Sequence, residues 1–115
     1  MKKILAVDDS AIDLKHLERL LGDAGALVIT ASTGNEALDK ARQELPQLIL
    51  LDVNMPGLDG FSTARKLAAD PATKNIPVVF VTAKDQKADR AFAQMLGAKG
   101  FVTKPCTSAD LAGYL

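Results

Sequence analysis

Short apolar runs alternate with amphipathic segments along the whole chain. The apolar runs occur at Ile4–Val7, Leu27–Ala31, Leu48–Leu51, Val78–Val81 and Gly100–Val102. The first, third and fourth contain almost no polar residue, which is typical of strands that are covered on both faces of a sheet. The pattern therefore predicts five β-strands, of which at least three are fully buried.

The segments between these runs have helical signals. In the first segment Leu14, Leu17 and Leu21 recur three and four residues apart, which predicts one buried face of a helix. Ser10 before them is a suitable N-cap, and Gly25 after them is a typical stop signal. This segment therefore predicts a helix that follows the first strand directly.

The next two segments predict helices with clear boundaries. Thr33 and Glu36 predict a capping box, in which each side chain accepts a hydrogen bond from the other residue's backbone N–H. The third helix is expected at Phe61–Ala69, and it ends at Asp70–Pro71 because the residue before a proline disfavours helical geometry.

The last two helices are shorter. Ala88, Phe92 and Met95 stand at helical spacing before a glycine and predict a buried stripe on the fourth helix. The fifth helix is expected to begin with Thr107 or Ser108 as its N-cap. Five strand–helix units in succession indicate an α/β fold with a doubly wound parallel sheet, strand order 2-1-3-4-5, and helices on both faces. We expect residues 1–115 to form one domain with this flavodoxin-like three-layer architecture.

Composition excludes several classes of function. Lys plus Arg and Asp plus Glu are both 14, so the formal net charge is zero, which argues against capture of nucleic acid or an anionic membrane. The single cysteine, Cys106, excludes an internal disulfide and a CxxC metal site. Apolar stretches are too short for a membrane span, and Asp8 and Asp9 interrupt the N-terminal run too early for a signal peptide. We expect a soluble, cytoplasmic protein.

Polar side chains follow four of the predicted strands. They are Asp8 and Asp9 after the first, Asp52 after the third, Thr82 at the end of the fourth and Lys104 after the fifth. The carboxyl ends of parallel strands lie at one edge of the sheet, and a crevice opens where the strand order reverses, between the first and third strands. We therefore expect three carboxylates, one hydroxyl and one ammonium to lie close together.

Three neighbouring carboxylates require positive charge. At about 4.5 Å and an effective dielectric constant near 20, each pair of like charges costs roughly 3–4 kcal/mol, and Lys104 supplies one positive charge. Oxygen ligands without histidine or thiol favour Mg²⁺. Carboxylate, Mg²⁺, ammonium and hydroxyl together suit phosphoryl transfer, with Asp52 as the nucleophile and Asp8 and Asp9 as metal ligands.

The chain resembles response-regulator receiver domains from Lys3 to about Leu111. The resemblance rests on four elements in the family's order: Asp8-Asp9 after ILAV, Asp52 with Met55-Pro56-Gly57 and Asp59-Gly60, Thr82-Ala83 after PVVFV, and Lys104-Pro105. It implies a two-component phosphorelay in which a sensor histidine kinase or a phosphotransfer protein phosphorylates Asp52 in a Mg²⁺-dependent reaction. The segment DPATKNIPVVFVTAKDQKADRAF resembles stand-alone regulators of chemotaxis and twitching type.

The resemblance also implies roles for individual residues. Asp9, Asp52 and the backbone carbonyl of Asn54 would bind Mg²⁺, and Asp8 would act mainly through water. The family usually holds the Lys104–Pro105 peptide bond in cis, which proline permits at low cost. Asn54 is also at a position that affects the lifetime of the acyl phosphate, as is Lys84 in this family.

A conformational switch follows from the same resemblance. Thr82 would contact the phosphoryl group, Lys104 would pair with it, and Phe101 would be the aromatic that turns inward when Thr82 moves. A plain core role for Phe101 is the alternative. A downstream effector protein would bind the surface formed by the fourth helix, the fifth strand and the fifth helix. We expect a monomer or weak homodimer that is no enzyme beyond catalysing its own phosphorylation and autodephosphorylation.

Two other functions compete with this one. A haloacid-dehalogenase-like phosphohydrolase uses a similar set of groups, but it has an acidic residue where Asn54 stands, and this chain is too short for its substrate cap. A degenerate receiver that acts only by protein interaction is opposed by the complete set of site residues. His16, the single histidine, is expected at the surface rather than as a phosphohistidine, and Cys106 as a small apolar residue.

Overall fold

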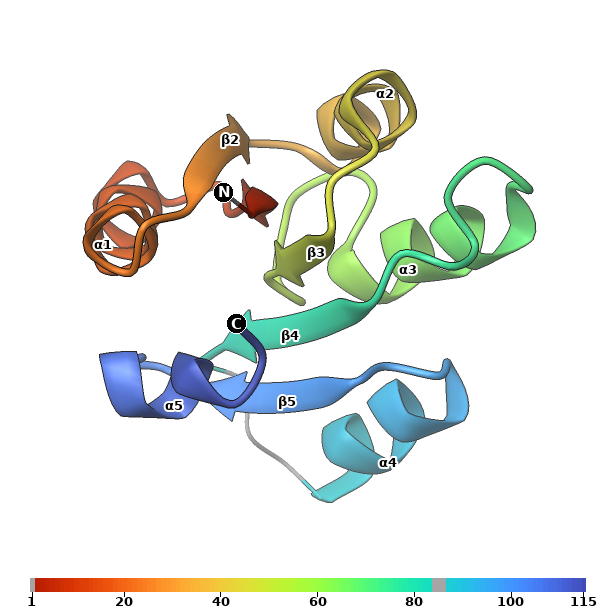
Figure 1. Ribbon diagram of the computed structural model, residues 1–115. Coiled ribbons are helices and arrows are strands. Elements are labelled where there is room, and N and C mark those ends of the chain that lie inside the picture. The colour runs from red at the N-terminus through yellow and green to blue at the C-terminus, as the bar shows by residue number, and fades with distance from the viewer. Residues whose placement is uncertain (1, 84–86) are drawn as a thin grey trace.

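Strands and helices alternate along the chain in the computed structural model, which describes residues 2–83 and 87–115 (Figure 1). The strands are β1 (Lys3–Val7), β2 (Leu27–Ala31), β3 (Leu48–Leu51), β4 (Val78–Thr82) and β5 (Gly100–Thr103). The helices are α1 (Ala11–Asp23), α2 (Gly34–Glu44), α3 (Gly60–Ala69), α4 (Lys87–Met95) and α5 (Ser108–Ala112). The predicted strands and helices are all present.

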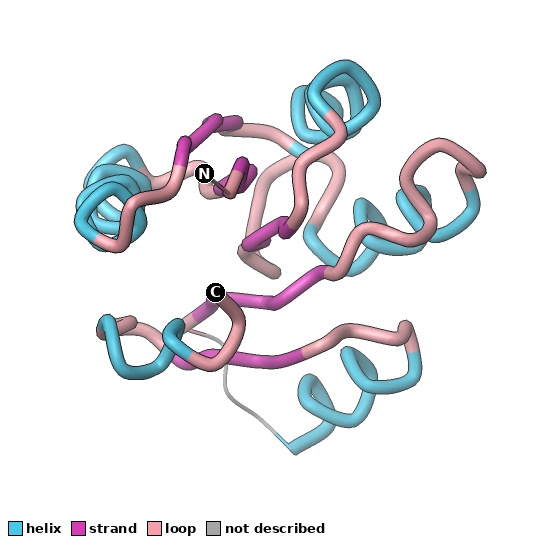
Figure 2. The backbone as a smooth tube through the Cα atoms, in the orientation of Figure 1, coloured by secondary structure: helices cyan, strands magenta, loops and turns pink. Residues whose placement is uncertain are grey.

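The strands form one parallel sheet with the order β2-β1-β3-β4-β5, which confirms the predicted topology. Helices α1 and α5 cover one face, and α2, α3 and α4 cover the other (Figures 1 and 2). Strand β1 is an interior strand, since Ile4 pairs with Val28 of β2 and with Leu48 of β3. The strand order reverses at β1 and β3, so the crevice at the carboxyl edge opens between them.

Alternate residues of the central strands build two separate cores. Leu5, Ile49 and Phe80 face α2, α3 and α4, whereas Leu50 and Val79 face α1 and α5. These side chains are all buried. Successive residues of a strand point to opposite faces, so a strand that is apolar throughout is the one that fits between two layers of helices.

Three helices begin with a hydroxyl N-cap, within the part of the chain described, and one predicted detail of these caps is wrong. Glu36 N donates to Thr33 Oγ1 at 3.1 Å, as expected. However, Glu36 Oε1 accepts from Ser32 N at 2.7 Å instead of from Thr33 N. The long glutamate side chain reaches one residue further back, where Lys40 Nζ also holds it through Oε2 at 3.2 Å. The start of α2 is therefore no capping box.

A complete capping box occurs at α5 instead. Thr107 N donates to Asp110 Oδ2 at 2.9 Å, and Asp110 N donates to Thr107 Oγ1 at 3.2 Å. Thr107 is therefore the N-cap, one of the two residues that the sequence left open. The same helix packs Leu111 into the core beneath it.

The predicted buried stripe of α4 is wrong at two of its three positions. Ala88 is exposed, and Met95 is 81% exposed. Phe92 is half-buried, and its ring meets the Phe61 ring edge to face, with centroids 4.8 Å apart. Asp89 and Ala93 are the buried residues of α4, so its buried face is rotated away from the predicted stripe.

The C-terminal end of the described chain packs onto β5. Tyr114 lies against Gly100, and a β-carbon on Gly100 would overlap the tyrosine ring and hydroxyl. Tyr114 also packs with the core between the sheet and helices α1 and α5. None of the helices in the described ranges is long and apolar enough to cross a membrane.

Candidate functional site

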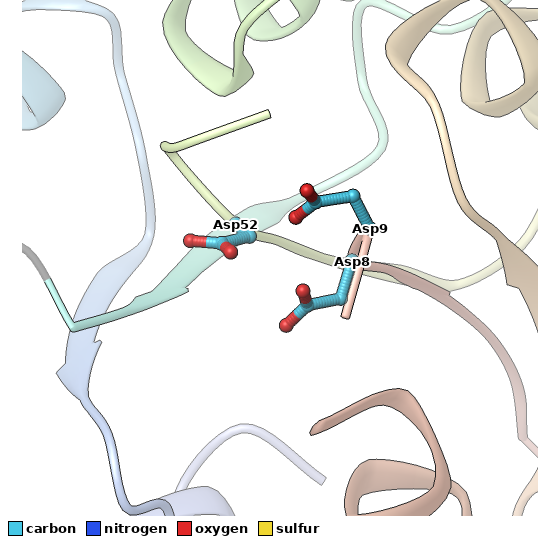
Figure 3. Close-up of side chains that lie close together, drawn as sticks. All are labelled: Asp8, Asp9 and Asp52. Carbon is cyan, nitrogen blue, oxygen red and sulfur yellow. The ribbon is translucent and has the colours of Figure 1, made fainter. Parts of the chain in front are cut away.

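The carboxyl ends of β1 and β3 bring three carboxylates together (Figure 3). Within the described residues, Asp8, Asp9 and Asp52 each place one oxygen within 4.8 Å of the other two. Asp8 is 1% exposed and Asp52 is 5% exposed, whereas Asp9 is open to solvent. The cluster therefore has two fixed, buried members and one that faces the approach of an ion or a phosphoryl donor.

Backbone hydrogen bonds hold the two buried carboxylates at the sheet edge. Asp8 N donates to Ala31 O at 3.1 Å, and Asp52 N donates to Val7 O at 3.0 Å. Each bond extends the pairing of the strands by one residue beyond the last regular position. Asp8 and Asp52 are consequently positioned by the sheet and not by a mobile loop.

The glycine-rich turn after Asp52 is explained by a close contact of two backbones. A β-carbon on Gly60 would overlap the carbonyl oxygen of Asp52 and would lie 2.7 Å from Val53 Cα. Gly60 N donates to Val53 O at 2.9 Å, and Gly57 has a φ of 75°, a conformation that glycine adopts at low cost. The start of α3 therefore packs directly against the backbone of Asp52.

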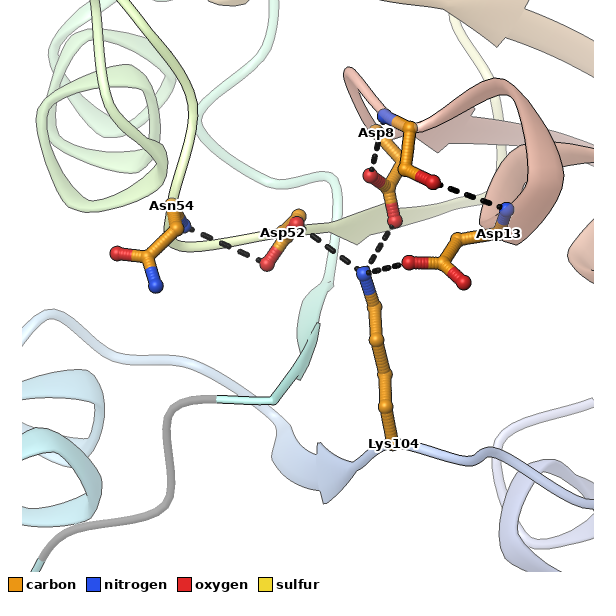
Figure 4. Close-up of polar contacts among 6 residues, drawn as sticks. Asp8, Asp13, Asp52, Asn54 and Lys104 are labelled. Carbon is orange, nitrogen blue, oxygen red and sulfur yellow. Dashed lines mark hydrogen bonds and ion pairs between the residues drawn. The ribbon is translucent and has the colours of Figure 1, made fainter.

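Lys104 lies at the centre of the site (Figure 4). Its Nζ atom is 2.6 Å from Asp8 Oδ2, 2.8 Å from Asp13 Oδ2 and 3.2 Å from Asp52 Oδ2. The Lys104–Pro105 peptide bond is cis, as the resemblance implied. Burial acts against the ammonium, but the hydrogen bonds to Asp13 and Asp8 raise the pKa of Lys104 well above its usual value. The lysine is therefore a permanent positive charge among carboxylates.

Burial and a neighbouring negative charge disfavour the ionised form of the Asp8 carboxyl. Burial raises its pKa, and the nearby negative charge of Asp52 raises it further. The hydrogen bonds from Lys104 and from Ser10 N, which is 2.9 Å from Asp8 Oδ1, counteract this effect. Since the pKa of Asp8 is raised on balance, the cluster favours uptake of a further positive charge.

Asp13 is the site residue that the sequence analysis missed. It lies in the first turn of α1, and its contact with Lys104 is the largest cause of the lowered pKa of the Asp13 carboxyl. The sequence did contain a signal, because Asp13 precedes the buried Leu17 by four residues and so lies on the inward face of the helix. Its position in the turn nearest the sheet edge completes that signal.

The donor set of the cluster fits Mg²⁺. It offers carboxylate oxygens without thiol or imidazole groups, which is the chemistry that a hard cation prefers. Asn54 is exposed, and its backbone N–H donates to Asp52 Oδ1 across 3.4 Å. That contact places Asn54 beside Asp52, and the role of its carbonyl as a ligand stays a prediction.

Thr82 and Lys104 come together at the ends of β4 and β5. Thr82 is fully buried at the last position of β4, where it pairs with Thr103. Lys104 N donates to Thr82 O at 2.9 Å. All five residues predicted from the strand ends therefore lie at the same edge of the sheet. Lys84 lies outside the described residues.

The ring of Phe101 on β5 is covered by the guanidinium of Arg90. Phe101 is half-buried, and its ring centroid is 6.4 Å from that of Phe80 in the core. The guanidinium of Arg90 lies 4.8 Å above the Phe101 ring and donates to Thr103 Oγ1 at 2.9 Å. Phe101 thus packs on the core and still borders solvent, and its role as a switch stays a prediction.

The remaining two candidates behave as expected. His16 is exposed, although its Nε2 lies 2.7 Å from the carbonyl oxygen of Cys106. Cys106 is 3% exposed, and burial raises the pKa of its thiol to about 11. His16 is therefore a surface residue and Cys106 a small buried one, as predicted.

The 2-1-3-4-5 sheet carries an acidic cluster at its crevice, and the lysine that follows β5 lies among the carboxylates. This arrangement is the one expected from the resemblance to receiver domains. Residues 4–115 match the family model of the response regulator receiver domain. The chain belongs to this family. Receiver domains are signalling phosphoacceptor modules of two-component phosphorelays, which bind Mg²⁺ at an acidic pocket and connect a histidine kinase to an effector.

Known receiver proteins resemble this receiver domain over most of its length. Protein PilH of Pseudomonas aeruginosa is 42% identical over 111 residues, which cover 96% of this chain and 92% of PilH. The chemotaxis protein CheY4 of Vibrio cholerae superposes with a TM-score of 0.92 at 33% identity, covering 99% of this chain and 95% of CheY4. These matches confirm the predicted resemblance to stand-alone, chemotaxis-type receivers.

A further solved structure bears on the acidic cluster. The receiver domain of a sensor histidine kinase from Pseudomonas aeruginosa PAO1 has a TM-score of 0.89 at 27% identity, and the match covers 98% of this chain and 93% of that one. It is described with a magnesium ion coordinated in the active site cleft. That protein shares the fold in which Asp8, Asp9 and Asp52 come together here.

Proposed function

We propose that Asp52 is the residue of this receiver domain that accepts the phosphoryl group, with residues 1–115 acting as one unit. The observation that carries the proposal is the position of the Lys104 ammonium, 3.2 Å from Asp52 Oδ2 and 2.6 Å from Asp8 Oδ2. This arrangement supplies a carboxylate nucleophile with a fixed positive charge beside it, at an open edge of the sheet.

The transfer follows from the groups around Asp52. A sensor histidine kinase or phosphotransfer protein presents a phosphohistidine, one Asp52 oxygen attacks phosphorus, the P–N bond breaks and the imidazole leaves with the electron pair. Lys104 stabilises the negative charge on the phosphoryl oxygens, and the Thr82 hydroxyl donates a hydrogen bond to one of them. The product is an acyl phosphate on Asp52.

The metal site is part of the same proposal. Asp8, Asp9, Asp52 and the backbone carbonyl of Asn54 would hold Mg²⁺, with Asp8 acting mainly through water. The ion, when bound, neutralises charge on the transferred phosphoryl group. The cluster of oxygen donors and the raised pKa of the buried Asp8 carboxyl support this assignment.

The output is proposed at the surface formed by α4, β5 and α5. Thr82 and Phe101 form the switch, because Lys104 N bonds to Thr82 O and Phe101 stands three residues before Lys104 on β5. Phosphorylation shifts an equilibrium between two arrangements of this surface, and one of them binds a downstream effector protein. We further propose a cytoplasmic monomer or weak homodimer that acts without contacting nucleic acid directly and catalyses its own dephosphorylation.

Intact-mass measurement after incubation with Mg²⁺ and acetyl phosphate tests the proposal. The wild-type chain is expected to gain about 80 Da, the mass of one phosphoryl group, and Asp52→Asn is expected to gain none. Asp39→Asn is the matched control, because Asp39 is an exposed carboxylate on α2 and should leave the adduct unchanged. A wild-type chain without adduct would reject the proposal, and repeated turnover of phosphomonoesters would favour a phosphohydrolase.

A further inference from the structure

The ammonium of Lys104 is bound by a carboxylate that lies outside the metal cluster. Among the described residues, three carboxylates contact Nζ, and two of them, Asp8 and Asp52, also belong to the cluster. The third is Asp13 of α1, at 2.8 Å. Its side chain is 43% exposed, whereas that of Lys104 is 16% exposed. Asp13 therefore holds the lysine from the solvent side.

The first turn of α1 fixes Asp13 beside the cluster. Ser10 N donates to Asp8 Oδ1 at 2.9 Å, and Asp13 N donates to Ser10 Oγ at 3.3 Å. The N-cap thus connects the end of β1 to the residue that contacts Lys104. Figure 4 shows Asp13 and Asp52 on opposite sides of the Lys104 ammonium.

A phosphoryl group on Asp52 must compete with these contacts. A lysine ammonium has three N–H donors, and in the described part of the chain each has one carboxylate oxygen near it. An additional phosphoryl oxygen can be bound only if one of these contacts is released. Asp8 and Asp52 have a second source of positive charge when the cluster holds a cation, but Asp13 does not belong to the cluster.

We propose that Asp13 is a positioning residue that competes with the phosphoryl group on Asp52 for Lys104. The side chain draws the ammonium toward α1 in the resting protein and so limits how tightly the site holds a phosphoryl group. The inference rests on the proposed role of Asp52 and adds a residue that adjusts the stability of the phosphorylated site.

Beryllofluoride, a non-covalent phosphoryl analogue, tests this role at saturating Mg²⁺. Asp13→Asn keeps the shape of the side chain and removes its charge, so the variant should bind beryllofluoride about fivefold more tightly, the size expected for loss of a partly exposed ion pair. Asp23→Asn, the same change at the exposed far end of α1, is the matched control and should bind as the wild type does. Equal affinities of the two variants would overturn the inference.

The same titration in a Lys104→Ala background shows whether Lys104 mediates the effect. Asp13→Asn should then leave the affinity unchanged, whereas tightening by the same factor would indicate a general charge effect and overturn the inference. A second measurement is independent of the analogue. In the metal-free protein, nitrogen-15 NMR should show faster proton exchange at the Lys104 ammonium in Asp13→Asn than in Asp23→Asn, and equal exchange would also reject the role.

Failure of the proposed function gives a different result. If the wild-type chain and Asp23→Asn both fail to bind beryllofluoride and to form the phosphoryl adduct, the assignment of Asp52 is wrong. If both bind and Asp13→Asn binds no more tightly, only the role of Asp13 is wrong.

Discussion

Helices α1 and α2 begin with the same local chemistry and use it differently. Each starts after a hydroxyl N-cap, Ser10 or Thr33, which accepts from the backbone N–H of an acidic residue in the first turn, Asp13 or Glu36. The two caps are equivalent in sequence, because the acidic residue stands three positions after the hydroxyl in both. The difference between them therefore has to come from the surroundings.

The two acidic side chains meet different lysines. Asp13 contacts Lys104, whose side chain is 16% exposed and is shared with the carboxylates of the cluster. Glu36 contacts Lys40, whose side chain is 34% exposed on the same helix, and accepts from Ser32 N. A capping sequence places an acidic residue in the first turn of a helix. The position of the helix over the sheet then decides whether that residue contacts the site or remains at the surface.

The largest expected difference is between the two lysines. Lys104→Ala should lower the free energy of unfolding of the metal-free protein by about 2 kcal/mol, because buried carboxylates lose their compensating charge. Lys40→Ala should cost less than about 0.5 kcal/mol, as is usual for a surface pair. Urea unfolding in the presence of chelator measures both. Equal losses would show that Lys104 contributes no more to the stability of the fold than the surface residue Lys40.

Stabilisation by Mg²⁺ should depend on the acidic cluster and not on the charge at the start of α2. At a free Mg²⁺ concentration tenfold above its dissociation constant, binding should add about 1.4 kcal/mol to the free energy of unfolding. Asp9→Asn should remove most of that gain, whereas Glu36→Gln should keep it. Thermal unfolding with Mg²⁺ or with chelator measures the gain, and an unchanged midpoint for the wild type would contradict the metal assignment.

The two caps should contribute similarly to stability. Ser10→Ala and Thr33→Ala should each lower the free energy of unfolding by about 1 kcal/mol, because each leaves a first-turn N–H without its hydroxyl acceptor. Only Ser10→Ala should also change the affinity for beryllofluoride, since Ser10 holds the turn that carries Asp13. Urea unfolding and a beryllofluoride titration separate the two effects. A changed affinity in Thr33→Ala would remove the distinction between the helices.

The smallest effect is a pH dependence at the start of α2. The hydrogen bond from Ser32 N, followed by that from Lys40, lowers the pKa of the Glu36 carboxyl below its ordinary value of 4.5. A lowered pKa in the folded state stabilises the protein above the ordinary value and loses this effect as the pH falls through the folded value. Glu36→Gln should therefore cost a few tenths of a kcal/mol at pH 7, after allowance for solvent screening.

This cost should disappear under acid conditions. Urea unfolding of Glu36→Gln and the wild type should differ at pH 7 and converge as the pH falls from 4.5 through the lowered pKa of the wild-type Glu36 carboxyl. A difference that persists at low pH would mean that the glutamate acts through its shape and not through its charge.

The sheet and most of the site could be predicted because both follow from strand alternation. Apolar runs identify strands covered on both faces, and parallel strands necessarily place Asp8, Asp52 and Lys104 at one edge. This inference needs only the strand order and the strand ends. It requires no knowledge of how any helix is rotated.

The errors and the omission all depend on helix rotation or side-chain length. Asp13 was missed because its contact with Lys104 depends on how α1 is placed over the sheet, which spacing within the helix alone does not give. Met95 is exposed because α4 is rotated so that Ala93 lies on its buried face, a rotation that the spacing of the apolar residues did not give. The α2 capping box fails because the Glu36 side chain extends past Thr33 N to Ser32 N and is also held by Lys40.

The contact between Tyr114 and Gly100 gives the protein an intrinsic optical reporter. The sequence has one tyrosine and no tryptophan, so ultraviolet emission excited near the tyrosine band originates from a single ring. That ring rests against the first residue of β5, next to α5. Rearrangement of the surface formed by α4, β5 and α5 can therefore be followed by the tyrosine fluorescence of the unlabelled chain.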